Sequence, residues 1–400
     1  MSALKSDTNA ALLVTLLAAA LFTAPCAAEQ PPAPAGKSFR PGAVWPDDKG
    51  VHINAHGGGI LFHDGTYYWF GEHKIAGGAG NVAHVGVHVY SSKDLVNWKD
   101  EGIALKVPDD PGSPIAKGCI IERPKVIYNP KTRKFVMWFH HELIGRGYDA
   151  SLSGVAVADK VTGPYKYLES FRPNAGAWPL NAPADLKKPL TPDEAGKLAK
   201  AGLRGNFVPE FARDMVLRRD FPGGQMARDM TLFVDDDGRA YHIYASESNS
   251  TLHVSELTDD FLKPAGNFVR LFPMRFNEAP ALFKRNGKYF LISSGCTGWA
   301  PNAARLASAD RLEGPWTELG NPCVGPADQA ATTFRSQSTF ILPVQGMKDA
   351  FLFMADRWNP KNAIDGRYIW LPIQFKDDGL PFIEWKDRWN LDVFDSGSTR

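Results

Sequence analysis

The sequence predicts an all-β protein, a five-bladed β-propeller, from three observations. A turn followed by an aromatic residue and an apolar run recurs five times along the 400 residues. Three of the five copies contain an Asp-Gly or Asn-Gly pair, the strongest local signal for a β-hairpin. Further strand-like runs and a second turn follow the hairpins. Each repeat therefore supplies about four short strands, and such units stacked radially form a propeller.

Each repeat consists of a hairpin followed by a second half. The hairpins lie at residues 63–74, 129–142, 236–247, 285–295 and 346–358. The second halves lie at residues 85–102, 154–170, 252–268 and 304–320, and the fifth repeat continues through 367–375 and 382–391. Short apolar runs bounded by turn residues are expected of buried strands.

The interval between the second and third repeats is longer than the others and predicts an insertion at residues 170–226. It contains TPDEAGKLAKAGL, in which Thr191 is a good N-cap, Pro192 suits the first helical position and Gly202 suits the stop. We therefore expect one short helix in this insertion.

The composition is that of a soluble globular protein, with 44% hydrophobic and 22% charged residues. The net charge is +1 and no dense Lys/Arg run is present, so no electrostatic field gathers nucleic acid or an anionic membrane. We expect neither as a partner.

The N-terminus predicts a signal peptide over residues 1–28. Lys5 precedes the apolar run ALLVTLLAAALFTA, and small residues offer a cleavage site before Glu29. This run is too short for a membrane span, and nothing later is long enough. The mature chain is expected to be secreted or periplasmic, with residues 40–400 forming a single catalytic domain.

Three cysteines remain after cleavage, which fits neither a disulfide framework nor a CxxC metal site. Cys296 and Cys323 belong to the same repeat, so a disulfide between them and two free thiols are both open alternatives. Cys119 is expected to be a buried thiol.

One position recurs before each hairpin and carries a hydrogen-bonding side chain in every repeat. Because the innermost strands of a propeller run side by side along its axis, these positions are expected to converge on one shallow pocket. The alternative is that each is an ordinary turn or strand-start residue. The five residues are His56, Glu122, Asp229, Glu278 and Gln337.

Carboxyl groups across a pocket suit glycoside hydrolysis, in which an acid protonates the leaving oxygen while another group activates water. Glu278 is the expected acid, because its neighbours Phe276, Ala279 and Leu282 are apolar and desolvation would keep it protonated. Asp229 is expected to raise the pKa of that acid by like-charge repulsion.

Further side chains are candidates for substrate contacts. Arg123 and Arg228 each adjoin an acidic candidate and are expected to pair either with that acid or with substrate. Trp299 in SGCTGW is expected to stack on a sugar face, and His140 to reach a hydroxyl. A second group of tryptophans is expected to pack the blades instead: Trp69, Trp138, Trp316 and Trp358.

The five repeats, with DLVNW, EGPW, RDMTLFVDDDG and NEAP, resemble glycoside hydrolase family 43 over almost the whole mature chain. Within it, AHGGGIL, ERPK, SGCTGW and SQST look most like the exo-β-1,3-galactanase group. The resemblance implies a five-bladed propeller that cleaves with inversion, with Glu278 as the acid and Asp229 as its pKa modulator.

One departure concerns the general base. The family's aspartate of the first blade is absent, since AHGGGIL has His56 and Gly57 in its place. The galactanase group shares this gap, and the resemblance assigns Glu122 the position of a sugar-contacting glutamate and Gln337 that of a glutamine holding the attacking water. Glu122 is therefore expected to be the base or a substrate anchor.

These observations predict a secreted, exo-acting hydrolase that releases galactose from β-1,3-galactan of arabinogalactan-type plant polysaccharide. The partner is an oligo- or polysaccharide, and no cofactor or metal motif is present. The alternatives are an α-L-arabinofuranosidase or galactofuranosidase of the same family, and a carbohydrate-binding propeller without turnover.

Overall fold

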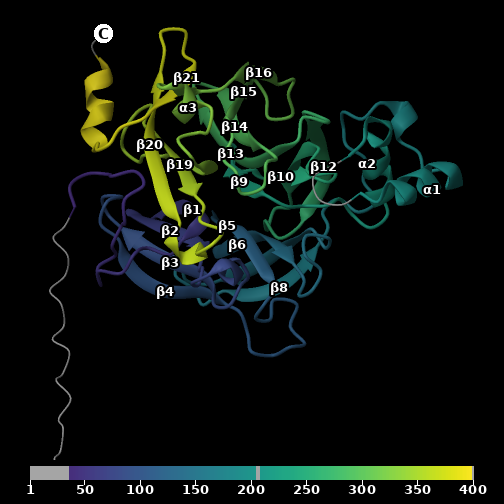
Figure 1. The fold of residues 1–400 in the computed structure, drawn as a ribbon, viewed down its shortest axis with the longest axis horizontal. Coiled ribbons are helices and arrows are strands. Elements are labelled where there is room, and N and C mark those ends of the chain that lie inside the picture. The colour runs from purple at the N-terminus through teal and green to yellow at the C-terminus, as the bar shows by residue number, and fades with distance from the viewer. Residues whose placement is uncertain (1–35, 204–207, 399–400) are drawn as a thin grey trace, which may run out of the picture. The chain divides into compact units, whose positions relative to one another are not determined.

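The computed structural model describes residues 36–203 and 208–398, and these form a ring of five antiparallel sheets (Figure 1). The predicted five-bladed propeller is confirmed. In the first four blades the strands follow the chain order outwards, so β1, β5, β9 and β13 lie near the centre of the view and β4, β8, β12 and β16 lie towards its edge.

The blades are formed by consecutive segments of the chain. The first contains β1 (His56–His63), β2 (Thr66–Glu72), β3 (Gly86–Ser92) and β4 (Lys99–Lys106). The second contains β5 (Ile120–Asn129), β6 (Lys134–Glu142), β7 (Leu152–Ala158) and β8 (Lys166–Phe171). The third contains β9 (Met230–Val234), β10 (Ala240–Ser246), β11 (Thr251–Leu257) and β12 (Pro264–Leu271). The fourth contains β13 (Asn277–Arg285), β14 (Lys288–Gly295), β15 (Arg305–Ala309) and β16 (Thr317–Gly320).

The fifth blade has one strand more. It contains β18 (Gln337–Pro343), β19 (Phe351–Arg357), β20 (Arg367–Phe375) and β21 (Pro381–Glu384), and β17 (Cys323–Val324) pairs in parallel with β21. The innermost strands contact one another in the order β1, β5, β9, β13, β18 and back to β1, which closes the ring.

The closure joins the first and fifth blades through an aromatic cluster. Trp69, Tyr368 and Trp370 are buried together with Phe39 and Trp389. The rings of Phe39 and Trp389 stack with centroids 4.2 Å apart, and their backbones form an antiparallel bridge. Large apolar rings at this seam therefore hold the first blade to the last.

The predicted hairpins form because their turn residues adopt the required left-handed backbone. Asp64 and Gly65 have φ of 46° and 70°, and Asn286 and Gly287 have φ of 50° and 78°. Two consecutive positive φ values define the type I′ turn, whose twist matches that of the flanking strands.

The predicted helix is α1 (Pro192–Ala201). Thr191 and Glu194 form a reciprocal capping box, and Gly202 ends the helix with φ of 56°. The insertion contains more helix than predicted, and α1 and α2 lie together beyond β12 in Figure 1. In the part of the chain that the structure describes, the additional short helices are α2 (Met215–Asp220), α3 (Ala327–Ala330), η1 (Gly78–Asn81), η2 (Ala184–Leu186), η3 (Glu210–Ala212), η4 (Ala363–Asp365) and η5 (Leu391–Ser398).

The cysteines are free thiols in the described structure, so the alternative of a Cys296–Cys323 disulfide is wrong. Cys323 packs in the core between the fourth and fifth blades, whereas Cys296 directly follows the last residue of β14. Cys119 is buried, as predicted.

The predicted signal peptide lies outside the described residues. Among the helices that the structure describes, none is long and apolar enough to cross a membrane.

Candidate active site

A cavity of about 550 Å³ opens where the inner strands begin. Glu122, Asp229, Glu278 and Gln337, four of the five residues predicted to converge, line it. The predicted contact residues Arg123, His140, Arg228 and Trp299 line it as well. Residues not predicted for the site also contribute to its wall: Glu72, Lys74, Gly78, Asn81, Val82, Ile120, Tyr148, Asn249, Gly298, Trp358 and Pro360.

A bulge recurs at three of the five repeated positions, His56, Glu122 and Glu278. The pairing of the first two strands shifts register between His56 and Gly59, Glu122 and Lys125, and Glu278 and Ala281. The residue after each of these three positions has a positive φ, 61° at Gly57, 56° at Arg123 and 52° at Ala279. A bulge with a left-handed residue re-aims its neighbouring side chain, and such bulges are common beside active sites.

His56 is the exception, because the structure does not bring it to the cavity. Its side chain is fully buried and its ring stacks on Tyr368 with centroids 5.1 Å apart. Gly366 makes room for it, since a Cβ there would lie 2.6 Å from the ring. Burial lowers the pKa of His56 well below its usual value, so the ring is neutral.

Glu278 has the surroundings of a general acid. The amide Nδ2 of Asn249 donates a 2.7 Å hydrogen bond to its Oε1. Burial, followed by the negative charge of Asp229, raises the pKa of the Glu278 carboxyl to about 7. The proton is therefore retained near neutral pH, where an ordinary glutamate has lost it.

Asp229 is fixed beside the acid by two donors. Its Oδ2 accepts a hydrogen bond from Nη2 of Arg123 at 2.9 Å and one from the backbone amide of Ala279 at 3.1 Å. Ala279 follows Glu278 in β13, so the bond ties the Asp229 carboxylate to the backbone of the acid. The charge of Asp229 is thus held beside the acid, and its role as pKa modulator stays a prediction.

Glu122, unlike Glu278, is held in the ionised state. Its Oε1 accepts a 2.7 Å hydrogen bond from the Tyr148 hydroxyl, and its Oε2 lies 3.1 Å from Nδ1 of His140. Burial opposes the charge of Glu122, but the bonds from His140 and Tyr148 hold its pKa low, at about 2. Nε2 of His140 faces Glu142 at 2.9 Å, and despite burial the two carboxylates raise the pKa of His140 to about 9.

Arg123 and Gln337 link the two carboxylate regions. Nη2 of Arg123 donates to Asp229 and to Oε1 of Gln337, at 2.6 Å for the latter, and Nη1 donates to the Ser338 carbonyl. Oε1 of Gln337 also accepts a bond from Nε1 of Trp358, and its Nε2 donates to Ser294. Arg123 and Trp358 can only donate, so the orientation of the Gln337 amide is fixed.

Two tryptophans form part of the wall. Trp299 is 46% exposed, and its ring meets that of Trp358 at 73° with centroids 6.0 Å apart. The prediction that Trp358 packs a blade is wrong, because it follows the end of β19 and borders the cavity. Trp69 and Trp138 are buried in the blade cores, as predicted.

Comparison with known proteins identifies the family. A family model described as glycosyl hydrolases family 43 matches residues 207–381. The solved structure of a family 43 β-1,3-galactosidase with galactodeoxynojirimycin is 54% identical, with a TM-score of 0.82, over 88% of this chain and 100% of that one. This chain belongs to glycoside hydrolase family 43.

This family 43 chain is also similar to two proteins of lower sequence identity. A variant of the exo-β-1,3-galactanase from Phanerochaete chrysosporium, solved with β-1,3-galactotriose, is 33% identical, with a TM-score of 0.70, over 89% of this chain and 69% of that one. A β-D-galactofuranosidase of Aspergillus niger is 29% identical over 119 residues, which cover 29% of this chain and 34% of that relative.

The family 43 site contains charged residues that the sequence repeats did not single out. Glu72 accepts a 2.8 Å hydrogen bond from the backbone amide of Arg123 and forms an ion pair with Lys74. Glu72 is the cross-strand partner of His56, just as His140 is the partner of Glu122. The sequence does contain a signal for such residues, because the second strands of the first two blades end in the polar runs GEHK and FHHE.

The same family 43 cavity brings together a histidine and two acids that could hold a metal ion. Ligand atoms of Glu122, His140 and Asp229 lie within 4.8 Å of one another. Both ring nitrogens of His140 already face carboxylates, and Asp229 is bound by Arg123. These internal partners satisfy the cluster, and a cation would have to displace them.

Proposed function

We propose that the chain is a secreted, exo-acting glycoside hydrolase that releases galactose from the β-1,3-galactan backbone of arabinogalactan-type plant polysaccharide, with inversion. The observation that carries this proposal is Glu278, whose raised pKa keeps a proton in the same cavity as Glu122 and Gln337. The names of the similar solved structures, a β-1,3-galactosidase and an exo-β-1,3-galactanase, support the choice of substrate.

Glu278 supplies the proton in the proposed reaction. It protonates the glycosidic oxygen as the bond to the anomeric carbon breaks through an oxocarbenium-like transition state. Asn249 fixes one oxygen of its carboxyl, and Asp229 keeps the acid protonated through its charge. Proton transfer of this kind contributes about 10² to 10⁴-fold to the rate.

Gln337 positions the attacking water. Its carbonyl oxygen already accepts bonds from Arg123 and Trp358, and one N–H of its amide is used by Ser294. The amide therefore holds water through its second N–H. Water attacks the anomeric carbon on the face opposite the leaving oxygen, which produces inversion.

Glu122 has a different part in the proposal. A pKa of about 2 makes its carboxylate a weak base, and a weak base removes a proton only late in bond formation. Its ionised oxygens are well suited to accept hydrogen bonds from sugar hydroxyls. We therefore assign Glu122 chiefly to anchoring the sugar and to receiving the water proton once the new C–O bond has formed.

Export is supported by the sequence of residues 1–28, with Lys5, an apolar run and a small-residue cleavage site. Mass determination of the N-terminus of the protein recovered from a host's secreted fraction tests it. A mature chain starting at Glu29 is the expected result, and an intact Met1 in the cytoplasm would reject it.

The reaction is tested by chromatography of the products released from β-1,3-galactan, an arabinan and a panel of aryl glycosides. Free galactose from the galactan with the arabinan intact supports the proposal. Release of arabinose would indicate an arabinofuranosidase of the same family. Release of galactofuranose from its aryl glycoside would indicate a galactofuranosidase, the activity named for the Aspergillus niger relative. Retention on immobilised galactan without any product would indicate a binding propeller.

A further inference from the structure

A buried turn joins β10 to β11 in the third blade and carries Asn249, the residue that donates a hydrogen bond to Glu278. Its first three residues, Glu247, Ser248 and Asn249, are all left-handed, with φ of 51°, 58° and 62°. Left-handed backbone is disfavoured for residues with a Cβ and is normally adopted by single residues. Three such residues in a row persist only where the surrounding structure imposes the conformation.

The carboxylate of Glu247, the first residue of the turn, is the centre of a buried hydrogen-bond network. Arg270 of β12 donates from Nε to its Oε1 at 2.8 Å and from Nη2 to its Oε2 at 2.7 Å. Nε2 of His253 lies 2.8 Å from Oε1, and the Thr251 hydroxyl donates to Oε2 at 3.3 Å. Burial opposes the charge of Glu247, but Arg270 and His253 hold its pKa low, at about 2. The ionised carboxylate is therefore held in one orientation by a two-pronged pair.

Arg270 is in turn held by the helical insertion. Its Nη1 donates to Oδ1 of Asp214, which directly precedes α2, at 3.0 Å. Its backbone amide donates to Oδ1 of Asn181 at 3.0 Å, and Nδ2 of Asn181 donates to its carbonyl at 2.8 Å. Both partners belong to the insertion, so a continuous chain of hydrogen bonds connects the insertion to the turn.

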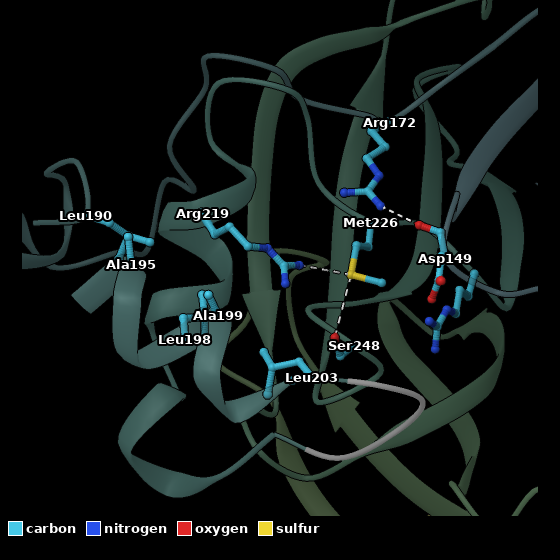
Figure 2. A pocket seen from close by; sticks show the side chains of 12 residues that line it. Asp149, Arg172, Leu190, Ala195, Leu198, Ala199, Leu203, Arg219, Met226 and Ser248 are labelled. Atoms are coloured by element: carbon cyan, nitrogen blue, oxygen red, sulfur yellow. Dashed lines mark hydrogen bonds between the residues drawn. The ribbon is translucent and has the colours of Figure 1, made fainter. Parts of the chain in front are cut away.

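The other residues of the turn are fixed as well. The hydroxyl and the amide of Ser250 both donate to the Glu247 carbonyl, at 2.8 and 3.3 Å. The Ser250 carbonyl accepts a 3.2 Å bond from the amide of Phe276, which directly precedes β13. The Ser248 hydroxyl points to Sδ of Met226, 3.7 Å away (Figure 2). The direction of the side chain that follows Ser248 is therefore set by the backbone of the turn.

We propose that Glu247 and Arg270 are positioning residues of the reaction, because their buried ion pair imposes the left-handed turn that directs Asn249 at the acid. Neither residue lines the active-site cavity, so both act through the turn. The insertion takes part as well, since Asp214 holds the guanidinium group from its outer side. This inference deepens the proposed function and rests on it for the role of Glu278 as the acid.

The test compares two arginine-to-lysine variants. Lysine keeps the charge but lacks the fork that bonds Glu247 and Asp214 together, so Arg270→Lys should loosen the turn. The matched control is Arg218→Lys in α2, since Arg218 is 6% exposed and Arg270 is 8% exposed. Both Nη atoms of Arg218 bond Glu194 of α1, at 2.7 Å each, rather than the turn. Both variants should lose stability in urea unfolding.

The two variants should differ in their pH profiles. A hydrogen bond to a carboxylate favours its charged form, so loss of the Asn249 bond should raise the pKa of Glu278. With Arg270→Lys, we expect the alkaline limb of kcat/KM for galactotriose to move to higher pH by about half a pH unit. We also expect kcat to fall about tenfold with little change in KM, because the acid is misplaced. Three other side chains that influence this pKa are the same in both variants: Asp229, Cys296 and Arg123.

The control sets the outcome. Arg218→Lys should keep the wild-type limb and kcat. An unchanged limb in Arg270→Lys, or the same shift in both variants, would overturn the proposal. Should Arg270→Lys not fold, Asp214→Ala takes its place, since the Asp214 side chain is 45% exposed and its removal takes no buried charge away. The same outcomes then decide.

A rescue variant tests whether the effect passes through the backbone of the turn. Glycine adopts a left-handed φ without a steric penalty. Ser248→Gly alone should therefore keep the wild-type limb, and combined with Arg270→Lys it should return the limb most of the way to its wild-type position. A double variant that keeps the full shift would reject the turn as the route of the effect.

A measurement without turnover separates this inference from the proposed function. The titration of the Glu278 carboxyl is followed by carbon-13 NMR of protein labelled at its glutamates, and Glu278→Gln identifies the resonance. If no glycoside is cleaved but the carboxyl titrates at higher pH in Arg270→Lys than in wild type and Arg218→Lys, the reaction proposal fails while the positioning role stands. If galactotriose is cleaved and the titration is the same in all three proteins, only the positioning role is rejected.

Discussion

The carboxylate of Asp229 accepts a hydrogen bond from the backbone amide of Ala279 at 3.1 Å, which fixes its negative charge beside Glu278. That charge is one of the causes that raise the pKa of Glu278 to about 7. Asp229→Asn keeps the acceptor and removes the charge, so the pKa of Glu278 should fall. We expect the alkaline limb of the kcat/KM profile to move to lower pH by about one pH unit.

The control for that variant is Asp235→Asn in the same blade, whose side chain pairs with Lys284 and does not line the cavity. Its pH profile should match that of the wild type. An unchanged alkaline limb in Asp229→Asn would show that desolvation alone sets the pKa of the acid.

Replacing the acid itself is the most direct test of the chemistry. Glu278→Gln keeps the hydrogen bond from Asn249 but cannot supply a proton, so kcat on galactan should fall by at least about 10²-fold. Binding of galactotriose, followed by calorimetry, should persist. A variant that retains wild-type turnover would remove Glu278 from the reaction.

The second amide N–H of Gln337 is assigned to the attacking water. Gln337→Glu retains an oxygen for Arg123 and Trp358 but removes the N–H donors, so kcat should drop by about 10²-fold with little change in KM. Ser294→Ala, which removes only the outer partner of the amide, should have a small effect. Steady-state kinetics on galactotriose distinguish the two, and equal losses would indicate that Gln337 acts through packing.

Trp299 is expected to act in binding alone. Because its exposed ring borders the cavity, Trp299→Ala should raise KM roughly three- to tenfold while kcat changes little, and Trp299→Phe should recover part of the loss. A fall in kcat without a change in KM would contradict a stacking role.

The buried His140 predicts a pH-dependent stability. Its pKa is raised from 6.5 to about 9, so the stabilisation from its two carboxylate partners is fully present below pH 6.5 and is lost as the pH rises through 9. The difference in free energy of unfolding between wild type and His140→Gln should therefore shrink over this range.

Urea unfolding at several pH values measures this difference. His63→Gln provides the comparison, because the partner carboxylate of His63, Asp64, is 90% exposed and little stabilisation is expected from it. A constant difference for His140→Gln across the range would show that the ring is neutral in the folded protein.

Much of the site could be predicted because it repeats. Glu122, Asp229, Glu278 and Gln337 occupy one position in successive blades, and a propeller brings equivalent positions together. The hairpin turns and the cap of α1 are local features, so the residues at Asp64, Asn286 and Thr191 determine them directly.

The parts that were missed depend on contacts across the ring. His56 occupies the repeated position, but its ring turns toward Tyr368 and Gly366 of the fifth blade, more than 300 residues away in the chain. Trp358 and Glu72 lie at the ends of second strands, and only the assembled ring shows that these ends border the same cavity. The run GEHK shows that the second strand ends in polar residues, but it does not show which cavity they border.

The seam between the first and fifth blades has a mechanical consequence. Phe39 and Trp389 meet there through stacked rings and a backbone bridge, and neither end of the described chain contributes a full strand to the other's blade. A pulling force applied to the two ends of the described chain would act first on the contact between Phe39 and Trp389. Because all five blades supply residues to the catalytic cavity, parting the seam would dismantle the cavity while each separate sheet is still intact.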